Sequence, residues 1–146
     1  STLFPYTTLF RSYTQLSFND LLLAIKKRIE DGTGKMCYDA VPKDAASPFY
    51  FAEIIQSRPA DTKTMYRMIY QVWLHSIAEP GASSVQVNDL IKGMEEAMTD
   101  EIVLPDGYEL IMQTNMGVQT IKTDETNEKH AVSLYQFTVC YGFKCK

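Results

Sequence analysis

The sequence predicts an α+β fold in the order α-β-β-β-α-β-β, with a mostly antiparallel sheet and two helices packed on one of its faces. Two segments carry apolar residues at helical spacing, and the segments between and after them alternate as strands do. No repeated β-α-β pattern indicates a doubly wound parallel sheet. Strand-rich regions broken by only two helices are typical of an α+β domain.

The first helix is predicted in LSFNDLLLAIKKRIEDGTG. Ser17 is a suitable N-cap, and Gly32 is expected to end the helix in the left-handed conformation. Lysine and arginine follow late in the segment, where the helix dipole favours cations. The apolar face comprises Phe18, Leu21, Leu22, Ile25 and Ile29.

Three strands are expected next, over residues 36–41, 49–56 and 64–77. Pro42 stops the first strand, and the second is apolar on both faces at its start. In the third, side chains from Tyr66 to Leu74 alternate onto a core face, while Ile69, Trp73 and His75 take the other face. Trp73 either contacts another subunit or is buried under a helix, and the sequence leaves both readings open.

The loop AEPGASS precedes a second helix, capped by Ser83 or Ser84. Two long strands then form a closing hairpin, and the polar segment TDETNEK at residues 123–129 is expected to be its tip, longer than a minimal turn. The apolar stripe of the second helix comprises Val87, Leu90, Ile91, Met94 and Met98.

Composition excludes several classes of function. The net charge of −4 argues against a nucleic-acid grip, which needs clustered Lys and Arg. No apolar run approaches the ~20 residues that span a bilayer, so no membrane partner is expected. Cys37, Cys140 and Cys145 are an odd count without a CxxC motif, which favours free thiols in a reducing cytoplasm.

No catalytic motif is visible. His75 and His130 are far apart in the sequence and lie in no metal-binding pattern. Cys140 with His130 is a conceivable nucleophile and base, but nothing supports the pairing. No glycine-rich loop could cradle a phosphate. We therefore predict no enzyme activity, no catalytic residues, no cofactor and no metal.

The runs CYDAVPKDAASPFYFAEI, DTKTMYRMIYQVWLHSIAEPG and LPDGYELIMQTNMGVQTIKTDETNEKHAVSLYQFTVCYGF resemble an uncharacterised phage and prophage family. That family is similar in layout to the tail-completion proteins of long-tailed phages, also called tail terminators or tail-to-head joining proteins. The resemblance covers residues 16–143. The matching positions are Tyr38, Asp39, Pro42, Pro48, Asp61, Thr62, Lys63 and Trp73.

The resemblance implies a virion protein of the head-tail joint, made in the cytoplasm of the bacterial host. Such proteins form a ring, typically a hexamer, that caps the tail tube. The implied partners are other copies of the chain, the tail tube protein and a head-completion or connector protein, while DNA passes through without specific binding. A second hypothesis is a small intracellular ligand-binding or enzymatic α+β domain carried by a prophage.

Two surfaces are the predicted protein interfaces. One is the mixed face of the long third strand, and the other is the charged hairpin tip, because loops carried by rigid strands often carry function. The predicted interface residues are Ile69, Trp73, Asp124, Glu125, Glu128 and Lys129.

Residues 1–12 read as an artefact, and residues 13–146 as a single tail-completion-like domain. The stretch TLFPYTTLFRS fits neither a helix nor a strand, and it matches, codon by codon, the translation of a common sequencing adapter.

Deleting residues 1–12 should leave the melting temperature within about two degrees, because surface changes are usually worth no more than ~0.5 kcal/mol. Thermal unfolding of the full and shortened chains measures this. A large loss of stability would contradict the adapter reading.

Overall fold

A computed structural model describes residues 14–125 and 127–144, so the predicted adapter segment lies outside the described residues. The predicted fold class and element order are confirmed. No helix in the described chain is long and apolar enough to cross a membrane. The elements are α2 (Phe18–Thr33), β1 (Cys37–Tyr38), β2 (Phe49–Pro59), β3 (Met65–Pro80), α3 (Ser84–Ala97), β4 (Glu109–Thr123) and β5 (Glu128–Phe143).

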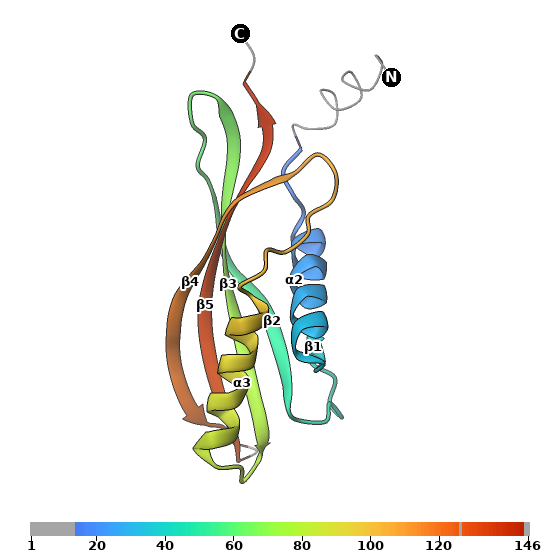
Figure 1. Cartoon of the computed structure of the whole chain (residues 1–146), viewed down its shortest axis with the longest axis vertical. Coiled ribbons are helices and arrows are strands. Elements are labelled where there is room, and N and C mark those ends of the chain that lie inside the picture. The colour runs from blue at the N-terminus through green and yellow to red at the C-terminus, as the bar shows by residue number, and fades with distance from the viewer. Residues whose placement is uncertain (1–13, 126, 145–146) are drawn as a thin grey trace.

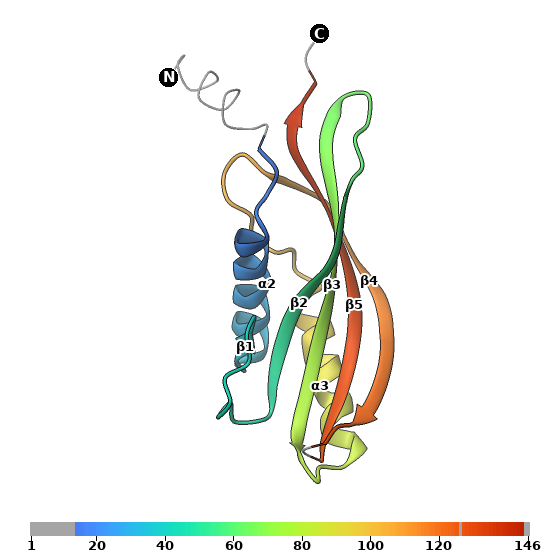
Figure 2. The same ribbon diagram turned by 180° about the vertical axis from the view of Figure 1, so that it is seen from behind.

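The five strands form one sheet in the order β1-β2-β3-β5-β4. The short β1 runs parallel to β2, and all other neighbours are antiparallel. Both helices lie on the same side of this sheet (Figure 1). Seen from behind, the strands stand in front of α3 (Figure 2). The described chain therefore has a helix-covered sheet face and a second face without helices.

The predicted alternation along β3 is confirmed. Met68, Tyr70, Val72 and Leu74 are buried and belong to the hydrophobic core under the helices. The residues between them project to the side without helices, which we call the open face. Directly paired residues of neighbouring strands share a face. The open face therefore includes Phe51 and Glu53 of β2, Ile69, Gln71, Trp73 and His75 of β3, Lys122 of β4, and His130, Val132, Leu134 and Gln136 of β5.

Apolar stripes hold the helices against the sheet, largely as predicted. In α2, Leu21, Ile25 and Ile29 are buried, but Phe18 is 51% exposed and was wrongly placed in the core. Phe18 is the first residue of the helix, and its ring meets that of Tyr70 in a T-shaped arrangement, 6.2 Å between centroids. The predicted stripe of α3 is buried throughout.

Two buried tyrosines fix the helix layer by hydrogen bonds as well as by packing. Tyr50 donates its hydroxyl to the carbonyl of Leu90 at 2.6 Å, and Tyr70 donates to the carbonyl of Leu16 at 2.8 Å. A buried hydroxyl without an acceptor would cost stability, so these bonds select one position of each helix over the sheet. Burial raises the pKa of Tyr50 to about 12, which keeps this donor protonated at neutral pH.

The helices approach each other where Gly32 faces Ala97. A Cβ at Gly32 would collide with Ala97, so the residue permits close packing of the two helices. The prediction that Gly32 ends the helix was wrong. Gly34 does so, with φ +73 and its N–H donating to the carbonyl of Glu30.

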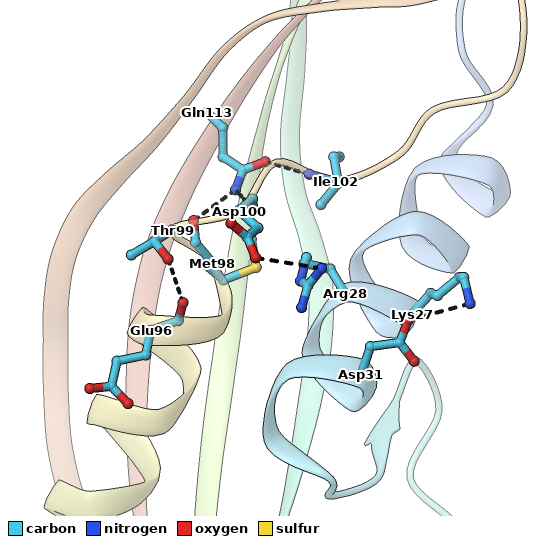
Figure 3. Close-up of polar contacts among 9 residues, drawn as sticks. All are labelled: Lys27, Arg28, Asp31, Glu96, Met98, Thr99, Asp100, Ile102 and Gln113. Atoms are coloured by element: carbon cyan, nitrogen blue, oxygen red, sulfur yellow. Dashed lines mark hydrogen bonds and ion pairs between the residues drawn. The ribbon is translucent and has the colours of Figure 1, made fainter.

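Gln113 of β4 ties the edge of the sheet to the end of α3 (Figure 3). Its amide nitrogen donates to the carbonyls of Met98 and Asp100, and its amide oxygen accepts from the N–H of Ile102. Arg28 of α2 lies 3.9 Å from the carboxylate of Asp100. One side chain thereby orders the segment that leads from the helix layer back to the sheet.

Several predicted boundaries differ from the structure. The first strand is only Cys37–Tyr38, β2 runs on to Pro59 instead of ending at residue 56, and β3 continues through Pro80, so the first three residues of the predicted AEPGASS loop are strand. The hairpin tip is shorter than predicted, because Thr123 still pairs with Lys129 and only residues 124–127 connect the strands.

Replacing Ile25 or Leu90 by alanine should lower the free energy of unfolding by roughly 2–5 kcal/mol, because both side chains are buried. Leu23→Ala is the matched control, since Leu23 is 63% exposed on the same helix as Ile25. Chemical denaturation measures all three. Equal effects at Leu23 and Ile25 would mean that the stripe is misplaced.

Candidate functional site

A hydrogen-bonded chain of three side chains crosses the open face. His75 Nε2 lies 2.9 Å from Glu53 Oε1, and His75 Nδ1 lies 2.6 Å from His130 Nε2. The three residues come from β2, β3 and β5, which are neighbours in the sheet. The chain therefore links three strands through side chains on the face that the helices leave uncovered.

The partners determine where the protons lie. A carboxylate only accepts, so His75 must donate from Nε2 to Glu53. A neutral His75 then has Nδ1 free to accept, and His130 must donate to it from Nε2. One tautomer of each ring satisfies the whole chain while both histidines are neutral. This assignment follows from the hydrogen-bond network.

The surroundings favour that neutral state. Burial is the main cause that lowers the pKa of His75, although the hydrogen bond to Glu53 opposes it. Burial also lowers the pKa of His130, assisted by the nearby charges of His75 and Lys122. The ring of Phe51 lies 4.9 Å from that of His75, and Trp73 meets His75 edge-on at 6.2 Å.

The cluster does not make a visible catalytic or metal centre. Among the described residues, no group of three or more His, Cys, Asp or Glu is arranged to hold a metal ion. The pairing of Cys140 with His130 does not occur, because ten residues of β5 separate them, about 33 Å along an extended strand. The Cys140 thiol donates to the carbonyl of Gly142 instead.

Two of the predicted interface residues lie on the same open face as the histidines. Ile69 is partly buried, and Trp73 is 37% exposed although it stands mid-sheet between the buried Val72 and Leu74. The alternative reading, that Trp73 is buried under a helix, was wrong, because the β3 alternation points it away from them. Trp73 is therefore available for contact on the open face.

The other predicted interface residues lie at the β4–β5 connection. Asp124 and Glu125 are in the turn, whereas Glu128 and Lys129 begin β5. The Asp124 carboxylate accepts from the N–H of Glu128 at 3.1 Å, and Asn127 accepts from the N–H of Gly81 at 3.0 Å. The turn is thus joined to the β3–α3 connection and lies at the His130 end of the open face.

A cleft of about 460 Å³ lies on the opposite side, between the two helices. Its lining includes Tyr50, Gln86, Asp89 and Glu96, and the nearby Glu79 carboxylate accepts from the Gln86 amide at 2.8 Å. None of the predicted interface residues lines this cleft.

Among the described residues, both helices pack on one face of a mostly antiparallel sheet, and no helix covers the other face. Residues 13–146 match the protein family described as "Putative tail termination protein". The chain belongs to this family. The predicted structural role in the phage tail is confirmed, and the chain is a tail component of the virion.

A solved structure of the virion of a native gene transfer agent particle contains a chain with a similar fold. The TM-score is 0.64 at 16% sequence identity, and the match covers 85% of this chain and 99% of that chain. At this identity the similarity establishes the fold alone. No curated protein sequence matches this chain.

Sequence reasoning missed the contact between the histidines and the role of Glu53. The only available signal was that Glu53, His75 and His130 each interrupt a largely apolar strand. Which of them meet depends on strand register, and register was not predicted.

Lowering the pH from about 7.5 to about 5 should destabilise the wild-type fold. The folded-state pKa values of both histidines are below the ordinary value, so the unfolded chain binds protons first and stability is lost as pH falls. Chemical denaturation across this range measures the slope.

The double variant His75→Gln with His130→Gln should show a flatter slope, whatever its stability at neutral pH. The same slope as the wild-type protein would assign the pH dependence to other groups.

Proposed function

We propose that this chain is a tail terminator that works as a ring, a hexamer, which caps the head-proximal end of the tail tube and presents a surface to a head-completion or connector protein. In this proposal the chain acts through contacts between proteins and not through catalysis. Family membership supports the class of function. The ring and its partners are the proposed part.

The main support for the proposed ring is the exposure of Trp73 on the open face. A large aromatic side chain that is 37% exposed in the middle of a sheet buries its area when another surface covers it. A head-to-tail contact between copies closes into a ring when the rotation between them is suitable. We place this contact on Trp73 and Ile69.

The charge of the chain is compatible with DNA passing through such a ring. The net charge is −4, and an acidic chain holds phosphates less strongly than a basic one. No specific DNA contact is part of the proposal.

We assign the β4–β5 turn to a contact with a second protein, the tail tube protein or the connector. The β4–β5 turn lies at an end of the elongated molecule, next to the β3–α3 connection (Figure 1). A turn at the end of rigid strands suits a contact along the tail axis better than one between neighbours in a ring.

A second candidate function, a ligand-binding domain, is favoured by the cleft between the helices. Its volume of about 460 Å³ falls within the range of small-molecule sites, and it combines the apolar Leu90 with the carboxylates of Asp89 and Glu96. A monomer that binds a small cation there would support this alternative.

Trp73→Glu should abolish ring formation, because a buried unpaired carboxylate strongly opposes the contact. The matched control is Val103→Glu, since Val103 is 78% exposed on the segment between α3 and β4. Light scattering coupled to size-exclusion chromatography and electron microscopy measure the assemblies.

Both variants should remain folded by circular dichroism. A Trp73→Glu variant that assembles like the wild-type protein would place the ring contact elsewhere. A wild-type protein that stays monomeric at high concentration would contradict the ring itself.

Replacing residues 124–128 by Asn-Gly should keep the β4–β5 hairpin and its register, because Thr123 and Lys129 already pair and would then flank a tight two-residue turn. Rings should still form, while joining to tail tubes or connectors should weaken. Sedimentation of the ring with purified tail tubes measures this. Unchanged joining would mean that the turn is only a connection between strands.

A further inference from the structure

We propose that the Glu53–His75–His130 chain is a pH-operated clip on the open face, which holds the surface for the subunit contact at neutral pH and releases it in acid. The inference rests on the proposed ring, since it assigns a regulation to the same surface. It begins from the geometry, with two histidine nitrogens 2.6 Å apart and a carboxylate 2.9 Å from the second nitrogen of His75.

The clip tolerates one added proton but not two. Either ring can hold the first proton. On His130 it sits at Nδ1, and the Nε2–H still donates to His75; on His75 it sits at Nδ1, which then donates to Nε2 of the other neutral tautomer of His130. A second proton leaves an N–H on both facing nitrogens, so that two donors face each other at hydrogen-bond distance. Two donors cannot share one bond, and the two positive rings repel each other. The bond between the histidines therefore breaks at the second proton.

The charged groups around the pair come from each neighbouring strand and from the turn. Glu53 faces His75 from β2 and favours its protonated form. Lys122 faces both histidines from β4 and disfavours protonation, while Asp124 and Glu128 favour protonation of His130. Burial acts against protonation at both sites and is the largest influence, so the clip stays closed at neutral pH.

Opening the clip changes the contact surface in two ways. His75 packs against Phe51 and against the edge of Trp73, so its movement removes a support of the exposed tryptophan. Two positive charges also appear on the open face, and one of them, on His75, is in contact with Trp73. Burying them against a neighbouring subunit would cost free energy, and this cost opposes the contact. Acid should therefore dissociate the ring before it unfolds the subunit.

The protein provides a direct readout, because its sequence contains only two histidines. Their side-chain NMR signals can be followed between about pH 8 and about pH 4.5 in Trp73→Ala, which loses the contact area of the indole and adds no charge beside His75. We expect two titrations, both below the ordinary histidine value, with the bond-sensitive nitrogen shifts changing at the second one. Two independent titrations near the ordinary value would overturn the clip.

Two variants of His130 separate the hydrogen bond from the charge. In His130→Gln the side-chain amide can donate to neutral His75 or, when turned over, accept from protonated His75, so the clip survives at each pH. His130→Leu has nearly the same size but cannot bond. We expect wild-type rings at about pH 7.5 that dissociate at about pH 5, His130→Gln rings at both values, and fewer His130→Leu rings at both.

The outcomes distinguish the inference from the function on which it rests. Rings of the wild-type protein that persist at a pH where NMR shows two protonated histidines overturn the clip and leave the ring intact. Dissociation of His130→Gln rings in acid, to the same extent as wild-type rings, also overturns it. The lack of any ring at neutral pH removes the proposed function, and the clip as a regulator of it falls with it.

Discussion

The architecture depends on the alternation of side chains along β3. This strand lies in the centre of the sheet and pairs with both β2 and β5, so its register assigns the faces of its neighbours as well. Val72 and Leu74 are fully buried under the helices, while Trp73 between them stays partly exposed. A slip of one residue would exchange the two sets and place Trp73 and His75 in the core. The β3 residues that are buried under the helices therefore determine which residues lie on the open face.

The helix layer in turn fixes how much of the sheet stays open. Tyr50 and Tyr70 bond the carbonyls of Leu90 and Leu16, and a buried donor that lost its acceptor would be costly. Gly32 lets the helices approach each other closely instead of spreading over a wider area. Gln113 of the edge strand β4 donates to the carbonyl of Met98 and so holds the segment that leads from α3 to that edge. These contacts gather both helices on one side, so nothing in the described chain is left to cover the other.

Periodicity predicted much of this arrangement. The stripes of both helices and the two faces of β3 follow from spacing alone, because they repeat over many residues. Single positions were less predictable. Phe18 fits the stripe of α2 but sits at its first turn beyond the packed part, and Gly32 resembles a helix terminator although its reason is contact with Ala97. In both cases the outcome depends on contacts with other elements of the fold, which the local sequence pattern does not show.

The histidine pair shows the same limit at the candidate site. His75 and His130 meet only because β3 pairs with β5 in one register, and Glu53 joins them only through the pairing of β2 with β3. None of these alignments could be read from local spacing. The predicted interface residues Ile69 and Trp73 were found because they depend on alternation within one strand. Family membership then identified the class of protein. Neither the alternation along β3 nor the strand register would have been sufficient for that.

A polar chain on the proposed contact face needs a reason beyond stability. Replacing buried polar groups by apolar ones of similar shape is often neutral or stabilising, so Glu53, His75 and His130 are not required to hold the sheet together. Apolar residues at these positions would also enlarge the exposed apolar surface around Trp73 and favour non-specific association. While Glu53, His75 and His130 hydrogen-bond one another, both histidines are neutral. In the proposal, protonation of both histidines makes them positive and breaks the bond between them. The helix-covered face is packed within the chain itself. A hydrogen-bonded polar chain suits a surface whose contact is meant to form with one kind of partner and at neutral pH.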